Sequence, residues 1–213
     1  MINILNKDHS IASHFMYEMR HKSIQNDRSK FRYNLKRLGE YMAFEISKSL
    51  EYKEETVETP LGLAKVNLLK NQPVVIGILR AALPFYNGFI DIFDQADGGF
   101  VGAYREEGED IEIQLDYLAV PNLDNRVVIL TDPMLATGKS LVKTVNKLLA
   151  YGKPAHIHVA AAIAAPEGID YISDCLNIDY TVWVYALDDK LDTRSYIIPG
   201  LGDAGDLSYG EKI

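Results

Sequence analysis

The residues best placed to do chemistry lie between Asp132 and Ser140, here called the phosphate loop. They follow an apolar run, 127–131, that predicts a buried strand, and they lead into a run that predicts a helix. A loop in this position can hold phosphate, because backbone N–H groups and the positive end of the helix dipole face the anion. Thr137 and Ser140 could add hydroxyl donors, and Asp132 is placed to bind sugar hydroxyls or a metal. An ordinary strand–turn–helix connection is the alternative.

The end of this loop, Gly138-Lys139-Ser140, matches the end of the ATP-binding pattern G-x-x-x-x-G-K-[ST]. The first glycine of that pattern would fall at position 133, which is occupied by Pro133. Proline has no N–H to donate to a phosphate, and its fixed φ does not suit a loop that needs glycine there. We therefore exclude an ATPase loop of this type.

A second unusual stretch runs from Tyr196 to Asp206, here called the base segment. Residues 200–206 include three glycines, one alanine and two aspartates, so little side-chain bulk separates the backbone from a ligand. A flat ligand with alternating donors and acceptors, such as a nucleobase, suits that surface. A flexible C-terminal loop is the alternative. The apolar anchors Ile197, Ile198 and Leu201 favour the binding site, because a disordered tail would not need them.

Two arginines follow apolar runs directly, Arg80 after residues 74–79 and Arg105 after residues 100–104. A guanidinium at the end of a buried strand can clamp phosphate oxygens with two hydrogen bonds. The chain has a net charge of −8, so a polyanionic ligand would need such local positive charge or a metal. The same charge argues against general binding to nucleic acid or acidic membranes.

Composition indicates a soluble, cytoplasmic protein. The chain has 213 residues, room for one well-buried domain, and its single cysteine cannot form an internal disulfide. The first residues lack the apolar core of a signal peptide, and no run approaches the roughly 18 apolar residues of a membrane span. We therefore expect no membrane partner.

Helix and strand patterns alternate along the chain. Apolar spacings of three and four predict an amphipathic helix over residues 27–50, after a shorter one around 11–19. A hairpin arm is predicted from residues 56–59 and 63–67. Further strands are predicted at 74–79, 100–104, 111–117, 127–131, 158–163 and 180–185, and further helices at 83–93, 139–150 and 168–176.

This alternation predicts an α/β fold with a mainly parallel sheet flanked by helices. We expect a single domain over residues 1–213, with N-terminal helices in residues 10–50 packed on the core and a C-terminal base-binding segment at 196–206. Ligands of such sheets bind at the carboxyl ends of the strands. Arg80, Arg105 and Asp132 all fall at predicted strand ends, which supports a site there.

Together these stretches resemble the uracil phosphoribosyltransferase family of type I phosphoribosyltransferases. The phosphate loop is similar to the family's D-P-M-L-A-T-G-x-S, and the base segment to its Y-I-[IV]-P-G-L-G-D-A-G-D. The segments 78–81, 104–105 and 164–168 fit in order and spacing. The resemblance covers residues 74–210 and extends more weakly to the N-terminus through Met19-Arg20 and Phe31-Arg32.

The resemblance implies transfer of a phosphoribosyl group from 5-phosphoribosyl 1-diphosphate to uracil, with Mg²⁺ as cofactor and UMP and diphosphate as products. Arg80 and Arg105 would bind the diphosphate, and Asp132 the ribose hydroxyls. Asp203 would act near the diphosphate through water, with no direct protein ligand to the metal. The substrate would also meet the rest of the phosphate loop: Pro133, Met134, Leu135, Ala136, Thr137, Gly138, Lys139 and Ser140. Uracil would meet Ile197, Gly202, Asp203 and Ala204.

The resemblance also implies a homodimer or homotetramer and, as in some relatives, GTP as an effector. The chain departs from the family pattern at Ala82 and Lys139, where the family usually has glycine or another small residue. A methyl group at Ala82 could crowd the diphosphate. The alternative hypothesis is therefore a catalytically weak, nucleotide-sensing regulator on the same fold.

Overall fold

A mainly parallel sheet forms the centre of the protein. The computed structural model describes residues 1–106 and 112–211, and over 103–106 and 112–116 it describes the backbone alone. The strand order is β1-β10-β9-β7-β4-β5-β6, with β8 beside β9, and only the β5–β6 pair is antiparallel. These strands are β1 Ile2–Ile4, β4 Val74–Leu79, β5 Asp97–Glu106, β6 Glu112–Ala119, β7 Val127–Thr131, β8 Met134–Leu135, β9 His156–Ala164 and β10 Tyr180–Leu187. The predicted architecture is confirmed.

The central strands are buried on both faces, as their unbroken apolar runs predict. Val74, Val75 and Ile76 of β4 are fully buried, and so is almost all of β9. Parallel strands covered by helices on both faces read as continuous apolar runs. The edge strand β1 and the two-residue strand β8 were not predicted, because so few residues carry no periodic signal.

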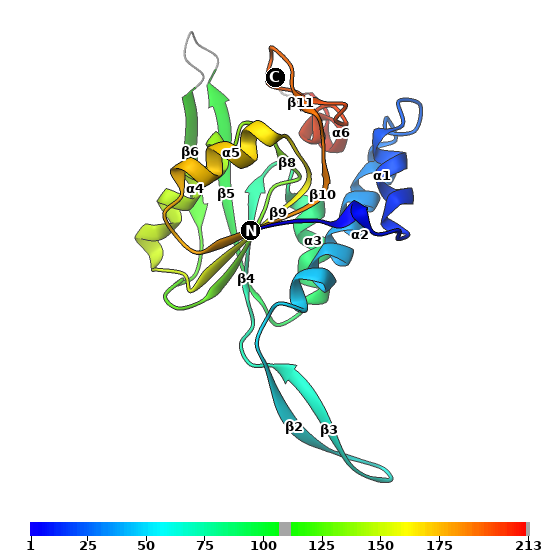
Figure 1. Ribbon diagram of the computed structural model, residues 1–213, viewed down its shortest axis with the longest axis vertical. Coiled ribbons are helices and arrows are strands. Elements are labelled where there is room, and N and C mark those ends of the chain that lie inside the picture. The colour runs from blue at the N-terminus through cyan, green and yellow to red at the C-terminus, as the bar shows by residue number, and fades with distance from the viewer. Residues whose placement is uncertain (107–111, 212–213) are drawn as a thin grey trace.

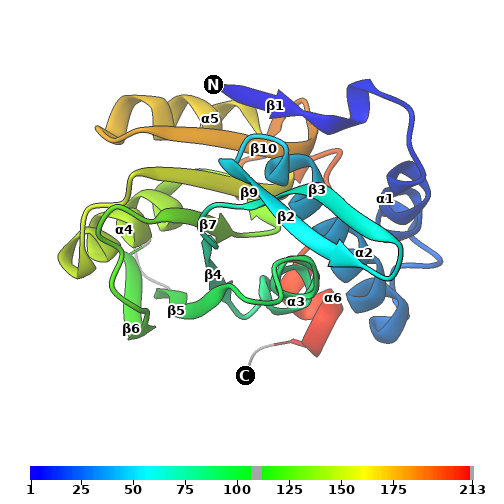
Figure 2. The same cartoon turned by 90° about the horizontal axis from the view of Figure 1, so that it is seen from below.

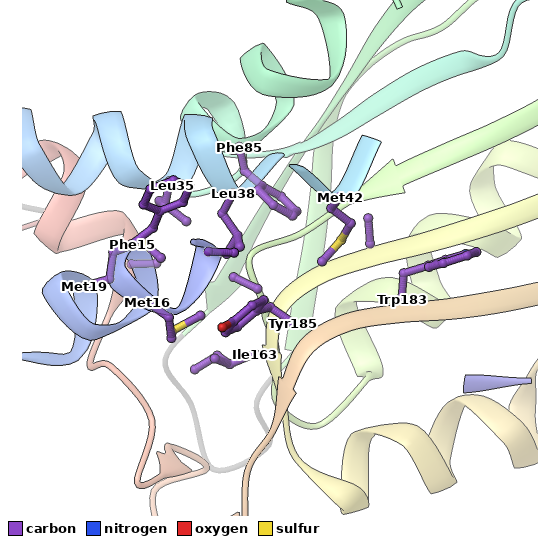
Figure 3. Close-up of a cluster of buried hydrophobic side chains, with 14 of the residues drawn as sticks. Phe15, Met16, Met19, Leu35, Leu38, Met42, Phe85, Ile163, Trp183 and Tyr185 are labelled. Carbon is purple, nitrogen blue, oxygen red and sulfur yellow. The ribbon is translucent and has the colours of Figure 1, made fainter. Parts of the chain in front are cut away.

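Helices cover the two faces of the sheet (Figure 2). One face carries α1 Ala12–Arg20, α2 Arg28–Ser47 and α3 Leu83–Ile92. The other carries α4 Lys139–Leu148 and α5 Pro166–Cys175. Figure 3 shows how Met16 of α1, Leu38 of α2 and Phe85 of α3 meet Tyr185 of the sheet. Apart from one antiparallel hairpin, the remaining elements are the short helices η1 Leu5–Lys7, η2 Leu149–Tyr151 and α6 Ala204–Tyr209 and the short strands β11 Lys190–Leu191 and β12 Ile197–Ile198.

The long helix α2 follows its sequence pattern closely. Asp27 caps its N-terminus, since the Asp27 carboxylate accepts a hydrogen bond from the backbone N–H of Lys30 at 3.0 Å. The predicted apolar stripe is buried, at Phe31, Leu35, Leu38, Met42 and Ile46. The stripe packs α2 against α3 and the sheet, so the N-terminal helices do lie on the core.

An antiparallel hairpin, β2 Tyr52–Thr59 and β3 Gly62–Leu69, projects from the end of the molecule opposite the C-terminal segment (Figure 1). The predicted hairpin arm is thus confirmed, and it is longer than its sequence pattern indicated. Leu61 and Leu63 at its tip are 100% and 77% exposed. In the described ranges of the chain, no helix is both long and apolar enough to cross a membrane.

Two histidines of β9 are hydrogen-bonded within the fold. The Nδ1 atom of His158, which is 5% exposed, accepts a hydrogen bond from Nε1 of Trp183 at 3.0 Å. His156 Nε2 lies 3.0 Å from Oγ1 of Thr181. Burial, with a smaller contribution from the neighbouring His156, lowers the pKa of His158 from 6.5 to about 4.

The pKa of His158 predicts a loss of stability in acid. Between pH 6.5 and about 4 the unfolded chain binds a proton at this position that the folded chain does not. The free energy of unfolding therefore falls as the pH drops through this window, by on the order of 3 kcal/mol from His158 alone. Urea unfolding at a series of pH values measures the slope. His158→Gln keeps an acceptor for Trp183 and should flatten it, whereas His9→Gln, at an exposed histidine, should not. Equal slopes in all three proteins would contradict this assignment.

Candidate functional site

Two predicted site residues follow neighbouring parallel strands. Arg80 comes directly after β4 and Asp132 directly after β7, and β4 pairs with β7. Their side chains therefore meet at the same edge of the sheet, where both line a cavity of about 210 Å³. The peptide bond between Leu79 and Arg80 is cis. Arg80 and Asp132 therefore come together at the carboxyl ends of their strands, as their places in the sequence predict.

The phosphate loop wraps around one side of the cavity. The carbonyl of Pro133 accepts hydrogen bonds from the N–H groups of Ala162 and Ile163, both at 3.1 Å, which fastens the start of the loop to β9. Asp132 Oδ1 accepts from the N–H of Met134 at 3.2 Å. The loop residues that line the cavity are Asp132, Met134, Leu135, Ala136, Thr137, Gly138 and Ser140.

Gly138 sets the geometry at the end of the loop. It has φ +74°, a left-handed conformation that glycine adopts without strain, and α4 begins at the next residue. A Cβ atom on Gly138 would lie 2.8 Å from the carbonyl oxygen of Gly168. The loop can therefore approach α5 this closely only with glycine at position 138.

Two predicted contacts of the phosphate loop point elsewhere. Among the described residues, those lining the cavity do not include Pro133, which is buried, or Lys139, whose side chain is exposed at the start of α4. The backbone N–H of Lys139 lies 3.5 Å from Oγ1 of Thr137. The ammonium group of Lys139 is therefore not part of the cavity lining.

The guanidinium of Arg80 joins the strand end to α6. Its Nη2 atom donates to Oδ1 of Asp206 at 3.2 Å and to the carbonyl of Gly210 at 3.3 Å. Both side chains are more than a third exposed, so the pair contributes little to stability. The pair does place the Arg80 guanidinium beside the Asp206 carboxylate at the cavity.

Arg105 lies one residue before the carboxyl end of β5. The strand predicted over 100–104 is longer in the structure, because β5 runs from Asp97 to Glu106. The extension comes from antiparallel pairing with β6, in which Arg105 lies opposite Ile113. The side chain of Arg105, and with it the predicted contact to a diphosphate, lies outside the described residues.

The base segment closes the cavity from the C-terminal side. Asp203 caps α6 by accepting a hydrogen bond from the N–H of Asp206 at 2.9 Å. Asp203, Ala204 and Gly205 line the same cavity as the phosphate loop, and so does Tyr196. Two stretches more than 50 residues apart in the sequence therefore line one cavity.

One contact joins the two stretches directly. The backbone N–H of Ala204 points at Sδ of Met134, with 3.4 Å between nitrogen and sulfur. A thioether is a weak acceptor. A ligand carbonyl in the cavity would be a stronger partner for this N–H, so the geometry suits a ligand with an oxygen at that position.

Two predicted base contacts do not line the cavity within the described part of the chain. Ile197 is 3% exposed in β12, and Gly202 is exposed with φ +92°. The apolar anchors are confirmed at Ile197 and Leu201, both 3% exposed, but Ile198 is 37% exposed and does not act as one. Successive residues of a strand face opposite sides, so Ile197 and Ile198 cannot both be buried against one surface.

The short β11–β12 pair, which leads into the base segment, is attached to α5. Glu167, in the first turn of α5, accepts a hydrogen bond from the N–H of Leu191 at 2.9 Å. That backbone hydrogen bond lowers the pKa of Glu167 below its usual value of 4.5. Glu167 thus connects the helix behind the phosphate loop with the base segment.

Sequence reasoning assigned individual contacts to only part of this site. Further residues line the cavity, namely Ile78, Leu79, Ala81, Leu141, Ser195, Tyr196 and Gly205, and Asp206 pairs with Arg80. Gly205 and Asp206 lie inside the base segment, so the sequence could have identified them as site residues. Ser195, in a left-handed conformation at φ 63°, carried no sequence signal of its own beyond preceding Tyr196.

Ala82 is not in the cavity. It is fully buried at the start of α3 and is not among the described residues that line the site. The methyl group that could crowd a diphosphate therefore packs into the core. No group of three His, Cys, Asp or Glu side chains that could hold a metal occurs in the described ranges.

Comparison with known proteins agrees with this geometry. A family model described as uracil phosphoribosyltransferase matches residues 6–210. A uracil phosphoribosyltransferase of Porphyromonas gingivalis is 46% identical over 98% of this chain and 98% of its own length. That of Pyrococcus furiosus is 37% identical over 97% of this chain and 89% of its own. The solved structure of the AQ2163 protein from Aquifex aeolicus superposes with a TM-score of 0.88 at 34% identity, covering all of both chains.

Proposed function

The chain belongs to the uracil phosphoribosyltransferase family, and from this membership we infer that it transfers the phosphoribosyl group of 5-phosphoribosyl 1-diphosphate to N1 of uracil. The products are UMP and diphosphate. The observation that carries the inference is the single cavity shared by the phosphate loop and the base segment. One side suits a phosphorylated ribose and the other a flat base, which are the two substrates that the reaction joins.

The roles of the site residues are proposed from their positions. The loop amides and hydroxyls from Ala136 to Ser140 hold the 5′-phosphate at the start of α4. Asp132 accepts hydrogen bonds from the ribose hydroxyls, and Arg80 binds the diphosphate together with Arg105. Uracil contacts Ala204 and the backbone beside it, and Ile197 and Gly202 are proposed as further contacts from the same segment.

We propose that the bond between C1′ and the diphosphate oxygen breaks as the bond from N1 of uracil to C1′ forms. The N1 proton leaves to solvent, and positive charge builds on the ribose ring in the transition state. A carboxylate at Asp132, beside that ring, stabilises this charge. The remaining acceleration comes from holding both substrates in line within one cavity.

Mg²⁺ is the proposed cofactor. Magnesium keeps several waters and is held by one or two carboxylates together with substrate phosphates rather than by an all-protein cage. Asp132 and Asp203 both line the cavity, so the carboxylates present suit an ion that arrives with the diphosphate, with Asp203 acting through water. Bound there, the ion would neutralise charge on the leaving diphosphate.

The alternative, a nucleotide-sensing regulator with weak turnover, rested on Ala82. Burial of that methyl group away from the cavity removes the observation that favoured it. We further propose a cytoplasmic enzyme of pyrimidine salvage that forms a homodimer or homotetramer, with GTP as a candidate effector. Self-association is supported by the exposed apolar residues of the hairpin arm, among them Leu61, Leu63 and Leu68. Light scattering with and without GTP tests the assembly.

One assay tests the main proposal. The purified protein is mixed with 5-phosphoribosyl 1-diphosphate, Mg²⁺ and uracil, and UMP is measured by chromatography. We expect UMP and diphosphate in equal amounts, and loss of product when EDTA removes the metal. Tight binding of UMP by calorimetry without any turnover would contradict the proposal and support the regulator instead.

A further inference from the structure

We propose that Asp188 is a positioning residue for base recognition: its buried carboxylate, balanced by Arg20, fixes the backbone of Gly200 in the base segment. The inference rests on the proposed function, since it assigns to Asp188 a part in binding uracil. Asp188 is outside the cavity and outside every stretch that the sequence singled out.

The carboxylate of Asp188 has two partners from distant parts of the chain. Asp188 directly follows β10 and is 8% exposed, and its own N–H donates to the carbonyl of Ala164 at 2.8 Å. Oδ1 accepts a hydrogen bond from Nη2 of Arg20 at 2.7 Å. Oδ2 accepts from the backbone N–H of Gly200 at 3.0 Å. One buried charge is thus shared between an arginine and the turn of the base segment.

A buried carboxylate persists only where donors compensate for its lost hydration. Here the position of each partner depends on the other, because removing either leaves Asp188 undersatisfied. Gly200 has φ +62°, and a Cβ atom there would collide with the carbonyl of Ile197. The turn is therefore held in one tight conformation, and Asp188 accepts from the N–H at its centre.

Two further side chains from the N-terminal helical region bind backbone carbonyls that follow Gly200 in the sequence. Nε2 of Gln25 donates to the carbonyl of Leu201 at 2.8 Å, and Nη1 of Arg32 donates to the carbonyl of Ser208 at 2.6 Å. Side chains of the N-terminal helical region thus hold the chain on either side of residues 203–205, which line the cavity. A site that reads a base through backbone groups depends on how firmly that backbone is placed. This gives the Met19-Arg20 part of the family resemblance a physical role.

Asp188→Asn tests the proposal, because it removes the charge and keeps the volume. Its amide must turn an N–H₂ group toward either Gly200 or Arg20, which opposes two donors. We expect the KM for uracil to rise by about 10- to 100-fold. The KM for 5-phosphoribosyl 1-diphosphate should change by less than about 3-fold, because the hydrogen bonds of the Asp188 carboxylate go to Arg20 and Gly200 and not to the phosphate loop. The matched control is Asp97→Asn, which breaks the exposed Arg126–Asp97 pair, 3.0 Å long, and should leave both constants unchanged.

Gln25→Met provides a second variant that removes one donor from a half-buried side chain. We expect this variant to raise the KM for uracil by about 3- to 10-fold. If Asp188→Asn does not fold, the KM of Gln25→Met tests the inference in its place. An unchanged KM for uracil in an active, folded variant overturns the inference, and so does an equal rise in both KM values. If the wild-type protein makes no UMP, the proposed function is overturned rather than this inference. The inference is then tested by calorimetry, which compares the affinity of the wild type, Asp188→Asn and Asp97→Asn for UMP.

Discussion

Cytosine is expected to react with a kcat/KM about 10⁴-fold below that of uracil. Uracil presents an oxygen acceptor at C4 and an N–H donor at N3, whereas cytosine presents an amine donor at C4 and an acceptor at N3. The backbone N–H of Ala204 points at the sulfur of Met134, and both residues line the cavity. A carbonyl oxygen of uracil suits this N–H, and the amine of cytosine would oppose donor to donor.

The size of the effect follows from leaving polar groups unpaired. Each buried donor or acceptor that loses its partner costs about 1–3 kcal/mol. Cytosine exchanges donor and acceptor at both C4 and N3. We therefore expect its transition state to be bound less favourably by about 5 kcal/mol, which corresponds to about 10⁴-fold in kcat/KM. Because the discriminating donor belongs to the backbone, no side-chain substitution in the cavity should invert this preference.

The measurement compares UMP and CMP formation under identical conditions, with chromatography to confirm that the cytosine contains no uracil. Competition between the two bases in one reaction gives the ratio of kcat/KM directly. Comparable turnover of both bases would show that fixed backbone donors do not select the base. It would contradict the assignment of uracil binding to the base segment.

Asp132→Asn is expected to lower kcat/KM by about 10²- to 10⁴-fold. The amide keeps an oxygen that can accept from the N–H of Met134, so the loop should stay in place. It loses the negative charge that would hold two ribose hydroxyls and stabilise positive charge on the ring. Hydrogen bonds to charged groups contribute about 1.5–3 kcal/mol each, and the loss of two gives this range.

Steady-state kinetics with both substrates measure the change, and a near-wild-type melting temperature shows that the fold is intact. The matched control is Asp174→Asn, the same substitution at an exposed residue of α5 outside the cavity, which should keep wild-type rates. An Asp132→Asn enzyme within about 3-fold of wild type would mean that this carboxylate does not contact the ribose.

Much of the architecture could be predicted because its signals are local. The apolar stripe of α2, the buried runs of β4 and β7, and the strand–loop–helix around Gly138 each lie within a short stretch of sequence. These signals are the apolar spacing, a capping aspartate and a glycine in the left-handed region. Each depends on neighbours in the chain, so it can be recognised in the sequence before the fold is known.

Other features depend on partners far away in the sequence. Strand β5 extends through Arg105 because β6 supplies its hydrogen bonds, and no local pattern shows where such pairing stops. The side chains of Lys139 and Ala82 point away from the cavity because of how α4 and α3 pack on the sheet.

The sequence by itself determined the fold class, the family and the two stretches that form the site, because each is written in contiguous residues. Only the tertiary structure decided which atoms of those stretches face one another. The phosphate loop acquires its partner when Ala204 meets Met134, 70 residues away, and the base segment is held by Asp188 and Arg20, 168 residues apart. Such contacts depend on packing between distant elements, which sequence periodicity does not encode.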